Sequence, residues 1–183
     1  MLPGMTVINP CDYNHTKLAT IALGDHIGPA YLRFGRPKWP IFTPANTKFQ
    51  IGKGIKFLDG NDISIFATGH MLWQALEAEK ILFSLGVSCE VINIHTIKPL
   101  DEKIILESIK KTKCAISCEE HNIIGGLGES ISRLISEKHP IPFKVIGVND
   151  SFGESGKPLD LLEKYNLNPE SIKEAALEVI DKK

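Results

Sequence analysis

Two adjacent carboxylates, an imidazole and three glycines occur together in the sequence EEHNIIGGLGES, which spans residues 119–130. Carboxylate and imidazole side chains are common general acids and bases in enzymes. A glycine turn that opens a helix can hold an anion on its free backbone amides. Six residues of this segment are therefore candidates for chemistry: Glu119, Glu120, His121, Gly125, Gly126 and Gly128.

A structural turn is the alternative interpretation of this segment, and we favour it. The glycine pattern is GGxG, which differs from the GxGxxG of a dinucleotide-binding turn. Glu119, Glu120 and Glu129 surround the turn with negative charge, which repels an anion. In the structural interpretation the glycines let the helix approach the preceding strand closely, while the carboxylates and His121 bond to neighbouring amides.

Other histidines and cysteines provide weaker candidates. Cys114, Cys118 and His121 suggest a metal site, but residues four apart on a strand lie about 13 Å from each other, beyond the reach of one ion. We therefore expect buried thiols. His70 follows a strand end, where ligands of α/β sheets gather, although a histidine there is as often the first residue of a helix. His95 precedes TIKPLD and is expected to hold a loop by hydrogen bonds.

The composition is that of a soluble globular protein, with 43% hydrophobic and 23% charged residues in a chain of 183. A net charge of -1, with acidic and basic residues interleaved, argues against binding to nucleic acid. No apolar run approaches the roughly 20 residues needed to span a bilayer, and the first residues lack the features of a secretory signal. We expect a cytoplasmic protein that binds neither nucleic acid nor membranes. Its four cysteines lie mostly in apolar sequence, which is typical of buried thiols in a reducing compartment.

The first 40 residues predict one strand–helix–strand unit, with strands over 5–9 and 29–34 and a helix over 12–23. From 41 to 62, prolines, glycines and short turns indicate a connection between domains, in which we expect a small hairpin. The sequence LDGND in this connection resembles the Gly-Asp-Gly motif of diphosphate-binding enzymes. It lacks the first glycine, so we do not assign it that role.

From residue 63 onward, strands and helices alternate to the end of the chain. We expect strands over 63–68, 88–94, 114–118 and 143–148. We expect helices over 70–85, 102–111, 129–138 and 159–165, and a last one from 169 onward. This alternation predicts an α/β domain with a doubly wound, mostly parallel sheet.

The two parts of the chain are unequal in size. Residues 63–183 contain enough strands and helices for a complete doubly wound domain, whereas residues 1–40 supply one strand–helix–strand unit, too little to cover both faces of a parallel sheet. We therefore expect 1–40 to be the end of a partial α/β domain. Its other strands would come from a truncated N-terminal region or from another polypeptide.

Six collinear blocks of the sequence together resemble the C-terminal part of transketolase, in the form encoded as two separate polypeptides. The blocks are PGMTVINPCDYNHT, GPAYLRFGRP, DISIFATGHM, EVINIHTIKPLD, CEEHNIIGGLGES and FGESGKPLDLLEKYNL. TIKPLD together with EEHNIIGGLG favours transketolase over two related classes, the 1-deoxyxylulose-5-phosphate synthases and the dehydrogenase E1 β subunits. These classes stay as alternatives, as does a non-catalytic interaction or regulatory domain.

The resemblance implies a function that this sequence cannot perform alone. Transketolases transfer a two-carbon ketol unit between sugar phosphates, using thiamine diphosphate and magnesium. The Gly-Asp-Gly motif and the activating glutamate of that family lie in regions outside this sequence. The resemblance covers the end of the pyrimidine-binding domain, over 1–40, and the C-terminal domain, over 63–183. It implies a chain that is inactive and binds no cofactor alone, an N-terminal transketolase partner, and a homodimer of the whole assembly.

The resemblance also implies a role for one arginine and a structural role for the opening segment. YLRFGRP resembles the transketolase stretch whose arginine binds the phosphate of the sugar, and by register this residue is Arg36. A guanidinium can give a phosphate two hydrogen bonds and stays charged. Arg33 is the nearby alternative, but it lies inside the expected strand and its side chain would face the opposite way. The family's C-terminal domain mainly supports the dimer, which agrees with a structural turn over 119–130.

Overall fold

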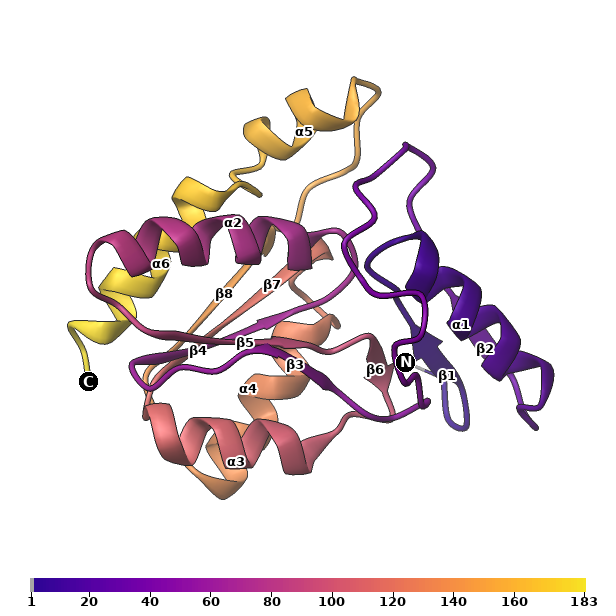
Figure 1. Ribbon diagram of the computed structural model, residues 1–183, viewed down its shortest axis with the longest axis horizontal. Helices are drawn as coiled ribbons and strands as arrows, with labels where there is room; N and C mark the ends of the chain where they lie inside the picture. Colours follow the sequence, from indigo (N-terminus) through magenta and orange to yellow (C-terminus); the bar gives the residue numbers. More distant parts are fainter. Residues whose placement is uncertain (1) are drawn as a thin grey trace.

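A five-stranded sheet forms the centre of the structure, a computed structural model that describes residues 2–183 (Figure 1). Its strands lie in the order β3-β5-β4-β7-β8. Their bounds are β3 Ile55–Leu58, β4 Ile63–Ala67, β5 Cys89–Asn93, β7 Ala115–Asn122 and β8 Phe143–Val148. All neighbouring pairs are parallel except β3 with β5, which is antiparallel. This confirms the predicted α/β class with a mostly parallel sheet.

Helices cover both faces of this sheet. The helices α2 (Met71–Ser84) and α6 (Pro169–Ile180) pack on one face, and α3 (Glu102–Thr112) and α4 (Leu127–Lys138) pack on the other (Figure 1). Successive residues of β4 point to opposite faces, so Ile65 joins the core under α2 and α6, while Phe66 joins the core under α3 and α4. Burial on both faces explains the continuous apolar runs of these strands.

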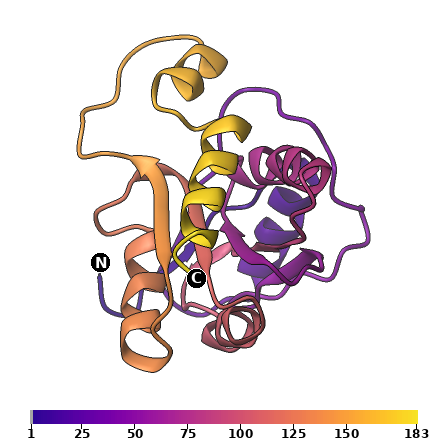
Figure 2. The same cartoon turned by 90° about the vertical axis from the view of Figure 1, so that its left-hand side faces the viewer.

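Side-chain caps fix the starts of two helices at the predicted positions. The carboxylate of Asp101 accepts a hydrogen bond from the amide of Ile104 at the start of α3. Asn168 does the same for Ser171 in α6, where Pro169 occupies the first helical turn. The short helix α5 (Pro158–Lys164) lies at the outer end of a loop that leaves β8 (Figure 2).

A second, smaller sheet contains the predicted strand–helix–strand unit. Strands β1 (Thr6–Ile8) and β2 (Ala30–Leu32) are parallel, and α1 (Tyr13–Gly24) connects them. A third strand, β6 (Thr96–Lys98), pairs antiparallel with β1 although it comes from the later part of the chain. The sequence pattern does not predict β6, because three residues between His95 and Pro99 carry no visible periodicity. Through β6, the smaller sheet is directly hydrogen-bonded to the segment that follows β5.

The prediction of a hairpin in the connection over 41–62 is wrong. Strand β3 lies within 41–62 as expected for a hairpin strand, but it pairs with β5 and not with its neighbour β4. The reason is that β4 already has parallel partners on both sides, β5 and β7, so only the outer edge of β5 is open to β3. The connection therefore supplies the edge strand of the central sheet.

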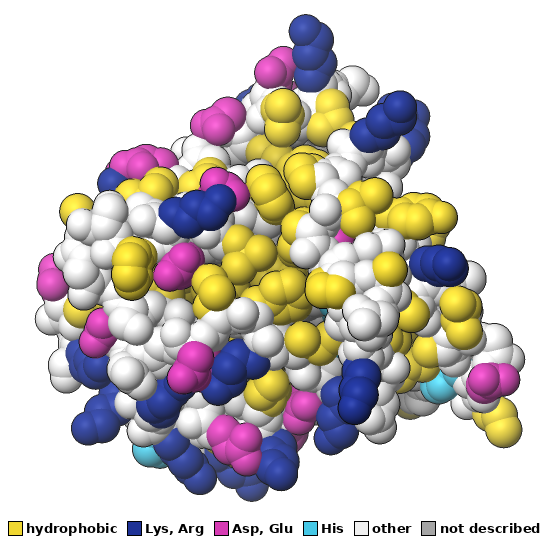
Figure 3. Space-filling view, viewed as in Figure 1, with side chains coloured by type: hydrophobic (Ala, Val, Ile, Leu, Met, Phe, Trp, Pro, Cys, Tyr) yellow, Lys and Arg dark blue, Asp and Glu magenta, His cyan; other side chains and the backbone are white. Residues whose placement is uncertain are grey.

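The structure confirms the predicted buried thiols. All four cysteines are free and buried. Among the described residues, no helix has the length and apolar character required to cross a membrane. Figure 3 shows hydrophobic side chains gathered in the middle and upper part of one face, with charged side chains mostly around its rim.

Candidate functional site

The candidate site lies at the carboxyl edge of the central sheet, where the smaller sheet meets it. His70 directly precedes α2 after strand β4, and Glu120 lies in the last half of β7. Arg33 follows the end of β2 and reaches across from the smaller sheet to Glu120. Ligands of open α/β sheets commonly bind at this edge, beyond the carboxyl ends of parallel strands.

Glu120 is the centre of a hydrogen-bonded group that links the two sheets. Arg33 donates from Nη1 to the Oε1 atom of Glu120 and from Nη2 to its main-chain oxygen, both at 3.3 Å. His70 Nδ1 lies 3.4 Å from the other carboxylate oxygen. Burial raises the pKa of Glu120, but the hydrogen bond from His70 and the charges of His70 and Arg33 outweigh burial and hold this pKa below its usual value.

The segment 33–39, which follows β2, folds over His70 on the other side. The rings of Trp39 and His70 are stacked, with centroids 4.5 Å apart and planes 13° from parallel. A Cβ atom placed on Gly35 would lie 2.1 Å from His70 Cε1, so only glycine fits there. The segment 33–39 is therefore packed closely against the start of α2.

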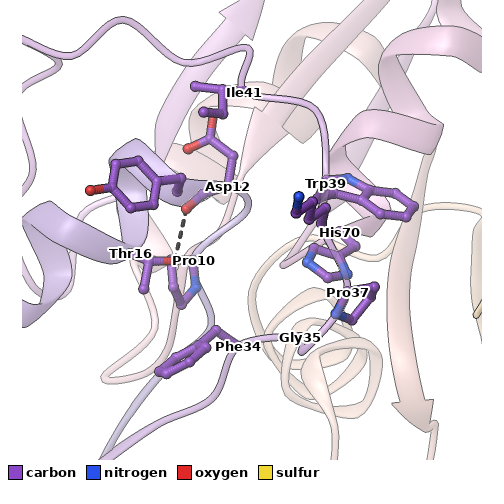
Figure 4. Close-up of a pocket in the computed structure, with 11 residues that line it drawn as sticks. Pro10, Asp12, Thr16, Phe34, Gly35, Pro37, Trp39, Ile41 and His70 are labelled. Atoms are coloured by element: carbon purple, nitrogen blue, oxygen red, sulfur yellow. Dashed lines mark hydrogen bonds between the residues drawn. The ribbon is translucent and has the colours of Figure 1, made fainter.

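A cleft of about 540 Å³ opens between α1 and this segment. Figure 4 shows its two sides facing each other, with Pro10, Asp12 and Thr16 on one and Pro37, Trp39 and His70 on the other. A second cleft, of about 320 Å³, shares Trp39 and His70 with the first and extends past Glu120 to α5. The stacked pair thus forms part of the wall of both clefts.

The glycine turn of the sequence analysis lies on the neighbouring helix start. Glu119 is fully buried, and its carboxylate accepts hydrogen bonds from the amides of Leu127 at 2.6 Å and Gly128 at 3.0 Å. His121 Nε2 lies 2.5 Å from the same carboxylate. An internal carboxylate therefore occupies the place at the start of α4 where a bound anion would lie.

The glycines of this turn are required for different reasons. A Cβ on Gly126 would lie 2.1 Å from a carboxylate oxygen of Glu119, and one on Gly128 would lie 2.4 Å from Val145. Gly125 has open space around it, but its φ of +79° favours glycine. These contacts agree with a packed structural turn.

Comparison with known proteins identifies the family. Residues 52–172 match the family model described as the transketolase C-terminal domain. This chain belongs to the transketolase C-terminal domain family. A split-gene transketolase, described as an inactive beta4 tetramer, has a closely similar solved structure, with a TM-score of 0.94 and 36% identity over 100% of this chain and 59% of that one.

Several transketolase subunits are similar to this chain over its whole length. The 6-deoxy-6-sulfo-D-fructose transketolase subunit of Clostridium sp. (strain MSTE9) is 38% identical, over 100% of this chain and 56% of that protein. An apulose-4-phosphate transketolase subunit of Phocaeicola vulgatus is 33% identical, over 98% and 58%. The 1-deoxy-D-xylulose-5-phosphate synthase of Halothermothrix orenii also matches, at 37% identity over 100% and 29%. The chain thus spans little more than half the length of the transketolase subunits.

The two candidate arginines of this transketolase C-terminal chain have different environments. The expected strand over 29–34 is shorter in the structure, because β2 ends at Leu32, so Arg33 lies just beyond the strand and not inside it. Arg33 is engaged by Glu120, whereas Arg36 is exposed and has no hydrogen bond or ion pair within residues 2–183. Gly35 and Pro37, on either side of Arg36, line the clefts. The two arginines do not share a partner, and phosphate binding by Arg36 stays a prediction.

The glycine turn at the start of α4 does not fit the diphosphate of the transketolase cofactor. The amides at the start of α4 are already taken by Glu119, so this glycine turn offers no place for a diphosphate. Within residues 2–183, no group of three His, Cys, Asp or Glu side chains is placed to hold a metal ion. In particular, Cys118 is fully buried, and burial raises the pKa of its thiol.

A buried polar cluster that the sequence analysis missed lies where the two sheets meet. His15 Nδ1 is 3.2 Å from Cys11 Sγ and 3.2 Å from Asn93 Nδ2. His95 Nδ1 lies 3.0 Å from the hydroxyl of the next residue, Thr96, and its Nε2 has no partner among residues 2–183, so the expected role in holding a loop stays a prediction. Burial lowers the pKa of His15, and it lowers that of His95 to about 3, helped by the nearby His15. Both imidazoles are therefore neutral near pH 7.

Proposed function

We propose that this chain is the C-terminal part of a thiamine-diphosphate-dependent transketolase. The enzyme transfers a two-carbon ketol unit between sugar phosphates in the cytoplasm. The observation that carries the proposal is the similarity to split-gene transketolase chains over the whole sequence and the whole fold. Because the chain spans little more than half of those proteins, the reaction itself is assigned to the complete assembly.

The parts of the reaction are divided between this chain and regions outside it. An N-terminal transketolase polypeptide or region holds thiamine diphosphate and magnesium, and two copies of the assembly form a dimer. The isolated chain binds no cofactor and is inactive. Two observations support this division: the α4 helix start is filled by Glu119, and the similar split-gene transketolase is described as an inactive beta4 tetramer.

Substrates with an anionic group at the end distant from the ketol unit suit this proposal. Arg36 would bind that group, because an exposed guanidinium that has no partner within residues 2–183 is free to give two charge-assisted hydrogen bonds. Two similar subunits are named for sugars with such groups, a sulfo group in one and a phosphate in the other. The charge of the terminal group, more than its identity, is what a guanidinium recognises.

The second candidate function is synthesis of 1-deoxyxylulose 5-phosphate, which the similarity to that class of synthase favours. The two reactions are distinguished by the donor. A synthase decarboxylates pyruvate and joins the remaining carbons to an aldose phosphate, whereas a transketolase moves a ketol unit and releases no carbon dioxide when the donor is a ketose phosphate. An interaction domain without chemistry would support neither reaction in any assembly.

Calorimetry on the isolated chain tests the division of roles. The chain should bind neither thiamine diphosphate nor magnesium specifically, while its mixture with a complementary N-terminal transketolase polypeptide should bind both. The complementary polypeptide alone serves as the control. Tight cofactor binding by the isolated chain would show that the cofactor site has been placed in the wrong region.

A further inference from the structure

Three segments that are far apart in the sequence converge around the carboxylate of Glu120. Arg33 comes from the end of β2, His70 from the end of β4, and Glu120 itself from β7. Their side chains are only 29%, 11% and 16% exposed, respectively. Ion pairs that are this sheltered are screened less by salt than pairs on the surface.

Arg36 lies between two contacts that hold the same segment. On one side, Gly35 packs against the His70 ring so closely that a Cβ would overlap it. On the other side, the ring of Trp39 stacks on the same histidine. Three anchors, at Arg33, Gly35 and Trp39, thus fix a short stretch of chain whose other two cations, Arg36 and Lys38, are exposed to solvent.

We propose that His70 and Glu120 are positioning residues for recognition of the anionic end of the substrate. They hold the segment 33–39 in one conformation, so that Arg36 is already placed where the phosphate or sulfonate arrives. This inference rests on the proposed function. It gives the C-terminal domain, which supplies both residues, a direct influence on substrate affinity in addition to its structural role.

Preorganisation is the physical basis of this influence. A binding residue on a mobile segment loses conformational freedom when the ligand arrives, and this loss lowers affinity. A segment held by an ion pair, a stacked ring and a close glycine contact has lost that freedom during folding. Removal of one anchor should therefore weaken the binding of substrates that use Arg36 and leave the chemical step unchanged.

Steady-state kinetics of the assembled enzyme with two donors tests the proposal. Glu120→Ala should raise the KM for a phosphorylated ketose by roughly tenfold, a size typical of lost positioning, with kcat unchanged. The KM for an unphosphorylated ketol donor should stay the same. Glu120→Gln, which keeps an oxygen acceptor for Arg33, should restore most of the affinity. Glu137→Gln is the matched control, because it removes the charge from another Arg–Glu pair, that with Arg133 on the surface of α4.

The contact between Gly35 and His70 supplies an independent test. Gly35→Ala should raise the KM for the phosphorylated donor because the new methyl group displaces the segment. His70→Ala removes the ring that the methyl group would meet at 2.1 Å. The double variant Gly35→Ala/His70→Ala should therefore be no worse than His70→Ala alone. Additive losses would show that the two residues act separately, and they would overturn the proposed mechanism of positioning.

The outcomes separate this inference from the proposed function. If Arg36→Ala is phosphate-specific and Glu120→Ala is not, the positioning role is overturned and the phosphate contact stands. If Glu120→Ala affects both donors equally, it acts on the fold as a whole, and the inference is also overturned. Calorimetric titration of the assembly with the same phosphorylated ketose measures the loss of affinity directly, so the variants remain informative even if the assembly does not transfer ketol units.

Discussion

Glu119 and Leu127 are joined by a hydrogen bond of 2.6 Å from the amide of the first residue of α4 to a fully buried carboxylate. The bond explains why a segment with the residue types of an active site contains a packed turn. The carboxylate that resembles a general acid is used to satisfy the helix start, and an imidazole, that of His121, closes over it. The Glu119 carboxylate and the first amides of α4 therefore satisfy each other within the chain, whereas the buried Nδ1 of His121 has no hydrogen-bond partner among residues 2–183.

Gly126→Val should destabilise the chain by roughly 3 kcal/mol, a value typical of overpacking, because its Cβ would lie 2.1 Å from the Glu119 carboxylate. Urea unfolding followed by circular dichroism measures the loss. Gly125→Ala is the matched control, since it meets no neighbouring atom and carries only the cost of a positive φ, about 1 kcal/mol. Equal losses in both variants would contradict the close contact at Gly126.

His121→Ala should lower the free energy of unfolding by about 1 kcal/mol, the size of one lost hydrogen bond. Glu119 would keep its two bonds to the start of α4, so the turn should survive. Turnover of the assembled enzyme should stay within a few-fold of the parent. A large fall in kcat without a change in melting temperature would instead identify His121 as a catalytic group.

Stability should decrease on mild acidification because of His95. Burial lowers its pKa to about 3 in the folded chain, against about 6.5 when unfolded. Above about pH 6.5 His95 is neutral in the folded and in the unfolded chain, so it costs no stability. As the pH falls from about 6.5 towards 3, the unfolded chain binds a proton at His95 that the folded chain does not bind, and stability is lost. At pH 5 the loss from this one group amounts to about 2 kcal/mol.

The variant His95→Leu isolates this contribution. It cannot titrate, so the difference in unfolding free energy between about pH 7.5 and pH 5 should be smaller than in the parent by about 2 kcal/mol. Urea unfolding at the two pH values provides both numbers. The same pH dependence in parent and variant would show that His95 is accessible to protons in the folded chain.

Arg36→Ala should raise the KM for phosphorylated sugars by about a hundredfold, which corresponds to charge-assisted hydrogen bonds worth roughly 2 to 3 kcal/mol. The slow reaction of an unphosphorylated donor, which never uses this contact, should barely change. Arg33→Ala is the control for register, and a larger phosphate-specific effect there would mean that the wrong arginine was chosen. Equal losses with both donors would remove the phosphate assignment altogether.

The strands and helices of the central sheet can be predicted from the sequence because the patterns that indicate them are local. Apolar runs and helical spacing predict the strands and helices after residue 63, and Asp101 and Asn168 mark helix starts by their own side-chain chemistry. A cap is made with residues two or three positions away. Such features are visible without knowledge of the fold.

The missed features depend on pairing between distant segments. Trp39 and His70 are stacked, and His15 contacts Asn93, but neither pair has a spacing that a periodic pattern could reveal. The pairing of β3 with β5 follows from which edge of the sheet is open, and this is known only after the strand order is known. The candidate site is built from such contacts, so the sequence predicts it only as separate residues.

Ketol transfer by the reconstituted assembly tests the central claim most directly. This chain and a complementary N-terminal transketolase polypeptide are assayed separately and together, with thiamine diphosphate, magnesium, a ketose phosphate donor and an aldose phosphate acceptor. The account predicts no transfer by either polypeptide alone, and formation of the new ketose phosphate without release of carbon dioxide when they are mixed. Transfer by this chain alone, or none with any complementary polypeptide that binds it and the cofactor, would contradict the account.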